Sequence, residues 1–300
     1  MRTARISGRA RALGVLIAAV TLVASMASIA NAAGPSLTIG AKNFSGAQII
    51  SQVWSQALQK KGYSITFKDQ IGPTEVVYPA LKSGQLDAYG DYQGTLLTYL
   101  GGTPSGTSQQ VYKELTAKLA GTGIVASTPA PALDVNGFYV SSKTAKKYNI
   151  KTLSDLAKSA PKLTFGGPQE CEVRPLCLGS TEQQLYGLKF KEVKKLDTGG
   201  PITASSLTSG DIDVGLLFTG SSEIPKGAVL VTDNKNLQPA DAPVLLIRKD
   251  KATPALLSIV NGVSAKLTTA AYNTMSLQVQ NQKLDPSAVA ATFLKQNKLP

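Results

Sequence analysis

The chain has 300 residues and a formal charge of +12, and it contains no histidine. The missing histidine excludes Ser–His–Asp and Cys–His catalysis and every histidine-ligated metal site, and two cysteines cannot form a structural zinc site alone. Its lysines and arginines are scattered, no nucleic-acid motif accompanies them, and no phosphate-binding loop or Rossmann fingerprint is present. We therefore expect no enzyme, no cofactor and no nucleic-acid partner.

Residues 1–32 have the pattern of a cleavable secretory signal peptide. Four arginines precede an apolar stretch over residues 13–29, which ends at the small-residue sequence Ala30-Asn31-Ala32. The stretch is short for a membrane span, although an uncleaved anchor is the alternative. No cysteine lies at the cleavage site for lipid attachment. We expect a periplasmic or secreted protein, whose charge falls to +8 when the four arginines are removed.

The residues that follow predict alternating strands and helices. A strand over 37–40 precedes a helix that starts with a Ser45–Gln48 capping box and ends at Gly62. The only tryptophan, Trp54, lies on the apolar stripe of this helix, so we expect it in the core. A strand over 63–68 and a helix capped by Thr74 come next. Strands over 86–89 and 124–126 and a helix around 111–119 complete this part.

A short sequence from this region occurs twice. Residues 83–87, Ser-Gly-Gln-Leu-Asp, recur at 209–213 as Ser-Gly-Asp-Ile-Asp, and the same offset of 126 places Tyr92 on Phe218. Chance similarity of a helix–glycine–strand unit is one explanation. The other is two related α/β lobes, each with an aromatic ring at the same structural point. Because ligands bind beyond the carboxyl ends of strands in open α/β sheets, two such rings would form a clamp.

The rest of the chain predicts a second lobe and a return to the first. Proline-containing segments at 129–131 and 238–243 mark two crossovers. Between them we expect strands over 137–140, 163–165, 190–196 and 229–231, and helices over 153–157 and 181–186. A strand over 244–247 and two or three helices then rejoin lobe 1. The predicted limits are 35–132 and 240–300 for lobe 1 and 133–239 for lobe 2, with a hinge able to close on a ligand.

Several segments resemble the solute-binding proteins of osmoprotectant ABC importers. They are Ile39-Gly-Ala-Lys-Asn-Phe44, residues 72–95, residues 148–156 and the closing Phe293-Leu-Lys295. The resemblance implies an α/β, two-lobed periplasmic-binding-protein fold of type II with the ligand in the cleft between lobes. It implies two kinds of partner. One is a small solute such as glycine betaine, choline or carnitine, and the other is a membrane permease with its ATPase. We expect a monomer; an interaction module that binds no solute is the alternative.

The resemblance assigns roles to residues at the ends of two strands. Tyr92 matches a tyrosine of the family's aromatic cage, and Thr95 matches a threonine whose hydroxyl holds the ligand's carboxylate. Lys42, next to Asn43 at a ligand-facing position, matches a second carboxylate contact. Plain packing of Tyr92 and a solvated position for Lys42 are the alternatives.

Arg174 lies between two cysteines, Cys171 and Cys177, that should pair in an exported protein. The closed loop is short, so the bond should mainly add local rigidity. A rigid loop suits a fixed contact between arginine and an anion. The resemblance implies that Arg174 binds the ligand's carboxylate, and a stapled loop with a solvated arginine is the alternative.

The remaining cage positions depart from the family pattern. Phe218 matches a cage tyrosine and keeps the ring face without the hydroxyl, with core packing as the alternative. Two further tyrosines are replaced, by Asn136 and by Ala240. At about 1 kcal/mol per ring, their loss weakens trimethylammonium binding by about tenfold to a few hundredfold. Asn136 and Asp134 add polar or anionic character, so the alternative is a receptor for a different polar or aromatic solute.

Overall fold

The computed structural model describes residues 34–179, 186–235, 237–238 and 240–300. The predicted signal peptide lies outside these residues, and so does the predicted helix over 181–186 except for its last residue. Within the described ranges, no helix combines the length and the apolar character that crossing a membrane requires.

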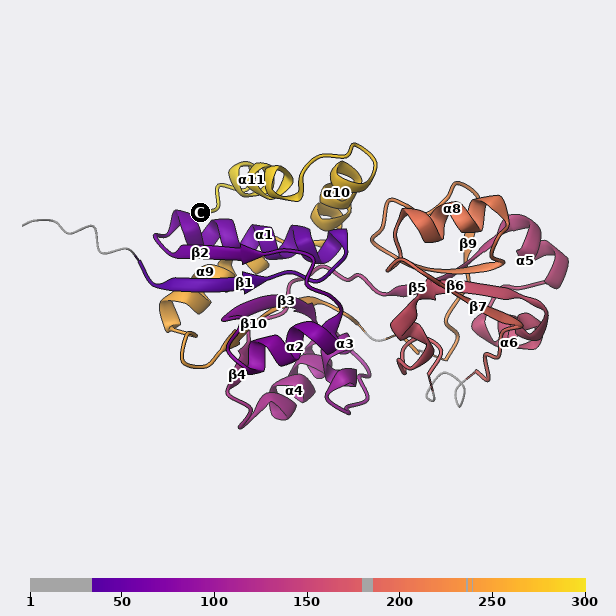
Figure 1. Cartoon of the computed structure of the whole chain (residues 1–300), viewed down its shortest axis with the longest axis horizontal. Coiled ribbons are helices and arrows are strands. Elements are labelled where there is room, and N and C mark those ends of the chain that lie inside the picture. The colour runs from indigo at the N-terminus through magenta and orange to yellow at the C-terminus, as the bar shows by residue number, and fades with distance from the viewer. Residues whose placement is uncertain (1–33, 180–185, 236, 239) are drawn as a thin grey trace, which may run out of the picture. The chain divides into compact units, whose positions relative to one another are not determined.

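The first sheet has five strands in the order β2-β1-β3-β10-β4 (Figure 1). Its strands are β1 (Ser36–Gly40), β2 (Ser64–Lys68), β3 (Ala88–Tyr92), β4 (Ile124–Ala126) and β10 (Pro243–Arg248). The first three are parallel, and β10 runs antiparallel to β3 and β4. Strand β10 therefore joins the sheet from a distant part of the chain.

Helices cover both faces of this sheet. They are α1 (Ser45–Lys60), α2 (Thr74–Lys82), α3 (Gln93–Tyr99), α4 (Ser108–Leu119), α9 (Pro254–Ser264), α10 (Thr269–Gln280) and α11 (Pro286–Gln296). Because side chains alternate along a strand, Leu245 packs with α1 and α9 to α11, whereas Val244 packs with α2 to α4. Helices α1 and α11 lie side by side (Figure 1). Trp54 is fully buried and its indole N–H donates to Ser264 Oγ, which confirms its predicted core position.

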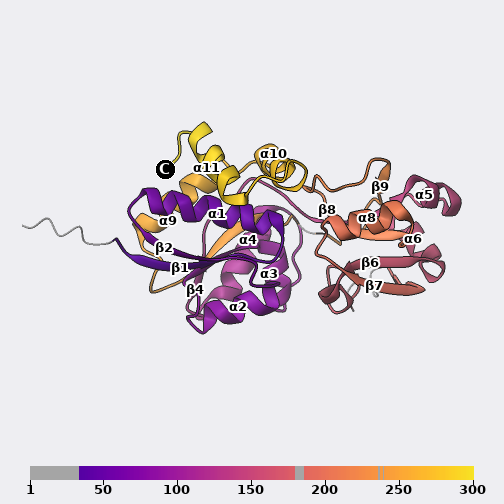
Figure 2. The ribbon, with the colours of Figure 1, turned by 45° about the horizontal axis from the view of Figure 1, so that its top comes forward.

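The second sheet repeats the arrangement, with the order β7-β6-β8-β5-β9. Its strands are β5 (Asn136–Ser141), β6 (Thr164–Pro168), β7 (Glu192–Leu196), β8 (Val214–Phe218) and β9 (Ala228–Leu230). Helix α8 (Pro201–Ser209) packs on one face (Figure 2), and α5 (Ser142–Tyr148) and α6 (Leu153–Ser159) lie on the other. We call the halves built on the two sheets lobe 1 and lobe 2; the limits given above for them remain a prediction.

The predicted internal repeat is confirmed by matching hydrogen bonds. Asp87 accepts from the backbone N–H of Thr38, and Asp213 accepts from that of Thr164, both at 2.9 Å. Thr38 and Thr164 are 126 positions apart, and so are Asp87 and Asp213. Strands β3 and β8 also occupy the same place in their sheets. The repeat therefore places the ends of β3 and β8, with Tyr92 and Phe218, at equivalent points.

Two chain segments connect the lobes and lie next to each other. In the first, the backbone N–H of Ala130 donates to the carbonyl of Pro243 at 2.9 Å. Further along, the N–H of Asp134 donates to the carbonyl of Asp241 at 3.3 Å. The two crossovers thus form a hydrogen-bonded pair between the sheets, which is the arrangement expected of a hinge.

Two predicted helix caps are wrong. Phe44, not Ser45, precedes α1 as its cap residue, and no side chain caps that end. Ser45 Oγ instead accepts from Gln280, and Gln48 donates to Asp69. Pro73 is the cap residue of α2, and the Thr74 hydroxyl is used elsewhere.

Candidate functional site

A pocket between the lobes brings together all eight residues predicted to contact a ligand. They are Lys42, Asn43, Tyr92, Thr95, Asp134, Asn136, Arg174 and Phe218. Its cavity volume is only about 20 Å³, and Phe44, Pro73, Glu170, Thr198 and Asp241 complete the lining. A wider pocket of about 260 Å³ adjoins it and shares Asn43, Phe44, Asp134, Thr198 and Phe218. The roles of these residues in binding remain predictions.

Three aromatic rings stack across the pocket. Tyr92 ends β3, Phe218 ends β8, and Phe44 precedes α1. The centroid of Phe44 is 5.9 Å from that of Tyr92 and 5.1 Å from that of Phe218, with interplanar angles of 26° and 27°. Phe44 was missed as a site residue, although an aromatic residue directly after Lys42-Asn43 was a usable signal. The ring of Phe218 is the one contributed by lobe 2.

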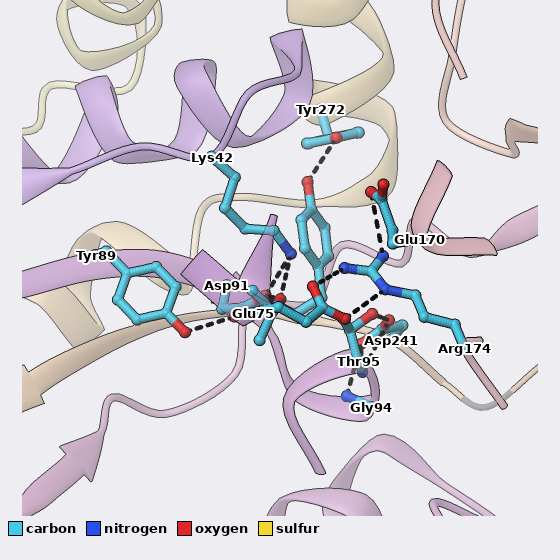
Figure 3. Close-up of polar contacts among 12 residues, drawn as sticks. Lys42, Glu75, Tyr89, Asp91, Gly94, Thr95, Glu170, Arg174, Asp241 and Tyr272 are labelled. Carbon is cyan, nitrogen blue, oxygen red and sulfur yellow. Dashed lines mark hydrogen bonds and ion pairs between the residues drawn. The ribbon is translucent and has the colours of Figure 1, made fainter. Parts of the chain in front are cut away.

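Lys42 is buried, and its charge is neutralised inside lobe 1 (Figure 3). Its Nζ atom lies 2.7 Å from Asp91 Oδ1 and donates to Thr74 Oγ1 at 2.8 Å. The Tyr89 hydroxyl donates to the other oxygen of Asp91 at 2.7 Å. A solvated position for Lys42 is therefore wrong. The same Nζ lies 5.6 Å from the Phe44 ring centroid and 5.7 Å from that of Tyr92, so the protein places its own cation against two rings.

Thr95 already holds a carboxylate, and that carboxylate belongs to the protein. Asp241, from the second crossover, accepts from the Thr95 hydroxyl at 2.6 Å and from the backbone N–H of Gly94 at 2.6 Å (Figure 3). The backbone N–H of Thr95 adds contacts of 3.2 Å. Burial raises the pKa of Asp241 to about 6 despite these donors. Asp241 was missed because its partners lie 146 and 147 positions away.

Arg174 forms an ion pair with a residue of lobe 1. Its Nε and Nη2 atoms donate to the two oxygens of Glu75 at 2.9 and 2.7 Å, and Nη1 lies 3.9 Å from Glu170 (Figure 3). Burial opposes ionisation of Glu75, but hydrogen bonding and the charge of Arg174 outweigh it and lower its pKa. The arginine sits in a loop closed by the predicted disulfide, which is confirmed between Cys171 and Cys177. Its geometry is that of a two-point carboxylate contact.

A chain of hydrogen bonds links the first crossover to the ring of Tyr92. Asp134 accepts from the Tyr272 hydroxyl at 2.7 Å and from the backbone N–H of Gly220 at 2.8 Å. The hydroxyls of Tyr272 and Tyr92 lie 2.9 Å apart. Burial raises the pKa of Asp134 to about 6. Asp134 thus joins lobe 2, through Gly220, to α10 of lobe 1.

The two substituted cage positions have different surroundings. Asn136 lines the pocket, and its amide donates to the carbonyl of Leu176 at 3.3 Å. The carbonyl of Ala240 accepts from Gln93 at 3.1 Å, but Ala240 does not line the pocket.

The chemistry of the pocket suits binding of a cation. Five carboxylates surround two basic side chains among the described residues; the carboxylates are Glu75, Asp91, Asp134, Glu170 and Asp241. In the described ranges, no group of three or more Cys, Asp or Glu residues is placed to hold a metal ion. Aromatic faces beside excess negative charge favour a soft organic cation.

Comparisons by sequence and by structure lead to the same group of proteins. A family model described as "Substrate binding domain of ABC-type glycine betaine transport system" matches residues 35–296. The carnitine transport binding protein OpuCC of Listeria monocytogenes is 27% identical over 299 residues, covering 94% of each chain. A glycine-betaine-binding protein of Pseudomonas aeruginosa is 26% identical over 277 residues, covering 88% of each. A crystal structure of a glycine betaine/carnitine/choline ABC transporter aligns with a TM-score of 0.66 at 22% identity, over 87% of this chain and 98% of that one.

Proposed function

Because the chain belongs to the family of substrate-binding domains of ABC-type glycine betaine transport systems, we propose that it captures a small quaternary ammonium solute between its two lobes. The family role is that of an extracytoplasmic substrate-binding receptor of an ABC importer, and not that of an enzyme. The fold is the type II periplasmic-binding-protein fold, as in the structural relatives. The solute and its contacts are the proposed part.

The observation that carries the proposal is the meeting of aromatic rings and carboxylates in one pocket. Phe44 lies within stacking distance of both Tyr92 and Phe218. Asp134 and Asp241 supply negative charge to the same pocket. Each ring over a quaternary ammonium contributes about 0.5–2 kcal/mol, most where water is excluded.

Binding requires the stack of rings to open between the lobes. A cation lies within about 6 Å of each ring that it contacts, and the centroids of Phe44 and Phe218 are only 5.1 Å apart. A trimethylammonium group therefore needs Phe218 to move away from Phe44. Since these rings belong to different lobes, a rotation about the paired crossovers supplies that movement.

The role in transport follows from the family. The closed, solute-loaded protein would dock on a membrane permease driven by an ATPase. It would act as a monomer in the periplasm or outside the cell, after removal of residues 1–32. These statements rest on the family and on the sequence.

A thermal-shift scan of the purified protein tests the proposal. The panel holds choline, glycine betaine, carnitine, ectoine and proline. A solute at about 100 times its Kd adds about 2.7 kcal/mol of stability, which raises Tm by several degrees. Failure of all quaternary ammonium solutes to raise Tm would overturn the proposal.

A ring variant then tests the site. Phe218→Leu keeps an apolar side chain and removes the ring, so we expect Kd to rise about 2- to 30-fold. Phe190→Leu is the matched control, because Phe190 packs against Phe165 in lobe 2 and does not line the pocket. Equal weakening in both variants would contradict a contact at Phe218.

A second candidate is the same receptor retuned to a different polar or aromatic solute. The observation that favours it is the close Phe44–Phe218 stack together with Asn136 in place of a cage tyrosine. A flat solute inserted between two rings needs less opening than a trimethylammonium group does. A Tm increase with an aromatic solute and none with choline or betaine would select this candidate.

A further inference from the structure

The groups that would recognise a ligand's carboxylate are already bound to carboxylates of the protein. Arg174 holds Glu75, Thr95 holds Asp241, and Lys42 holds Asp91. All three contacts are between 2.6 and 2.9 Å, the range of charge-assisted hydrogen bonds. A zwitterionic solute would have to displace one of these internal carboxylates or bind without a carboxylate contact.

The acceptor capacity of the pocket, by contrast, is not fully used. Glu170 Oε1 is buried and accepts no hydrogen bond within the described part of the chain, although Arg174 Nη1 lies 3.9 Å away. Glu170 lines the pocket on the lobe 2 side, four residues before Arg174. A buried carboxylate oxygen without a donor is costly. It is placed to accept from a hydroxyl or N–H group of a solute.

The charge around the pocket also favours a cation without a carboxylate. Glu75 and Asp91 neutralise Arg174 and Lys42 one to one, which leaves Asp134, Glu170 and Asp241 as excess negative charge. A carboxylate brought into this pocket is repelled at short range by these carboxylates, whereas a cation is attracted by them. The site therefore has the charge of a cation site rather than of a zwitterion site.

We infer that the protein selects an organic monocation that carries a hydrogen-bond donor and no carboxylate, and that Glu75 and Asp241 exclude zwitterions by occupying Arg174 and Thr95. This inference rests on the proposed function and narrows it. Choline has the required features, since it joins a quaternary ammonium to a hydroxyl. Glycine betaine has the cation and replaces the hydroxyl with a carboxylate.

Calorimetric titration of the purified protein with four solutes tests the inference. The solutes are choline, tetramethylammonium, glycine betaine and 3,3-dimethylbutan-1-ol, the uncharged carbon analogue of choline. We expect choline to bind at least about tenfold more tightly than glycine betaine, because of the like charge in the pocket. Tetramethylammonium should bind more weakly than choline because it offers no donor to Glu170, and the uncharged alcohol should bind least.

Three variants assign the selectivity to residues. Glu75→Gln and Asp241→Asn free Arg174 and Thr95 from a charged partner, so each should lower the choline-to-betaine affinity ratio at least about fivefold. Glu170→Gln removes negative charge from the pocket and weakens the acceptor for a hydroxyl, so it should weaken both choline and tetramethylammonium, and choline by the larger factor. The matched control is Asp250→Asn, because Asp250 forms the same two-point pair with Arg248 on the surface, away from the pocket. The choline-to-betaine affinity ratio of Asp250→Asn should equal that of the wild type.

The outcomes separate this inference from the proposed function. Tighter binding of glycine betaine than of choline would overturn the inference alone, and so would unchanged ratios in Glu75→Gln and Asp241→Asn. Binding of none of the quaternary solutes would overturn both. Circular dichroism melts of each variant establish that it is folded before its titration is compared.

Discussion

At the scale of single residues, Tyr272 connects the first crossover to the aromatic site. Its hydroxyl donates to Asp134 and lies 2.9 Å from that of Tyr92. Tyr272→Phe leaves a buried carboxylate with one donor fewer, so we expect a loss of about 1–3 kcal/mol in the free energy of unfolding. Urea denaturation measures it. Tyr99→Phe is the control, because Tyr99 is partly exposed and its change should stay within about 0.5 kcal/mol. Equal losses would contradict the role of the hydroxyl.

Asp241 makes the free energy of unfolding depend on pH, and the sign of this dependence follows from its raised pKa. In the folded protein burial raises its pKa from 3.8 to about 6, so between these values the folded state holds a proton that the unfolded state has released. Stability therefore falls as pH rises from about 4 to about 6. Asp241→Asn removes this contribution, so relative to wild type it should gain up to about 3 kcal/mol between pH 4 and pH 7.

Urea denaturation at pH 4, 5, 6 and 7 measures this difference. Asp250→Asn is a control of opposite sign, because hydrogen bonds from Arg248 lower the pKa of Asp250. Its stabilising contribution is lost only as pH falls below about 4, so the difference between that variant and wild type should stay nearly constant from pH 5 to pH 7. A difference between Asp241→Asn and wild type that does not change with pH would contradict a raised pKa at Asp241.

Residues that the sequence placed correctly lie at strand ends. Lys42 follows β1 and Tyr92 ends β3, at the edge where open α/β sheets bind ligands, so their positions could be predicted. Their partners could not. Asp91 and Asp241 are acidic residues with no local pattern to distinguish them. Thr74 was predicted to cap a helix, but its hydroxyl donates to Asp91 instead.

At the scale of elements, the loop over 171–177 fixes Arg174 in lobe 2. In the chain-entropy account, a loop of this length contributes about 2 kcal/mol to the free energy of unfolding. The double variant Cys171→Ser/Cys177→Ser should therefore lose about that much, and it should also bind the preferred solute more weakly. Denaturation and calorimetry measure the two effects. A loss of stability with unchanged affinity would show that the loop does not position the site.

The repeated strand–helix unit allows a paired test. Asp87 and Asp213 each accept from the backbone N–H of a threonine, Thr38 or Thr164, at 2.9 Å. Replacing either with alanine leaves an N–H without its acceptor, so each variant should lose about 1–3 kcal/mol. The two losses should add in the double variant, because the sites are in different sheets. Urea denaturation measures all three, and a loss at only one position would contradict equivalent roles.

The internal repeat could be predicted from the sequence because a glycine follows the helix in both copies. Gly84 and Gly210 both have positive φ, +82° and +86°, where other residues are strained, and both end a helix before a strand. The predicted caps at Ser45 and Thr74 failed for the opposite reason. Their hydroxyls found partners in distant elements, which local sequence does not reveal.

At the scale of the whole molecule, contacts between the lobes were beyond prediction. Glu75 and Arg174 are 99 positions apart, and Asp134 and Tyr272 are 138 apart. The two crossovers were predicted from prolines, and they fix which sheet each segment joins. They do not fix which side chains meet across the cleft, since that depends on the angle between lobes.

The Glu75–Arg174 pair and the Phe44–Phe218 stack are two of the contacts that join the lobes, besides the hydrogen bonds from Ser221 and Ser222 to Gln280. A two-point ion pair at partial exposure contributes up to about 1 kcal/mol, and an aromatic pair contributes about 0.5–1.5 kcal/mol. Removing both in Glu75→Gln/Phe218→Leu should therefore shift the population toward a more open form by about 2- to 70-fold. We expect a larger radius of gyration by small-angle X-ray scattering for this variant without solute. The control Asp250→Asn/Phe190→Leu loses the same kinds of group away from the cleft and should scatter as the wild type does. Identical radii for all three proteins would mean that the Glu75–Arg174 pair and the Phe44–Phe218 stack do not set the angle between the lobes.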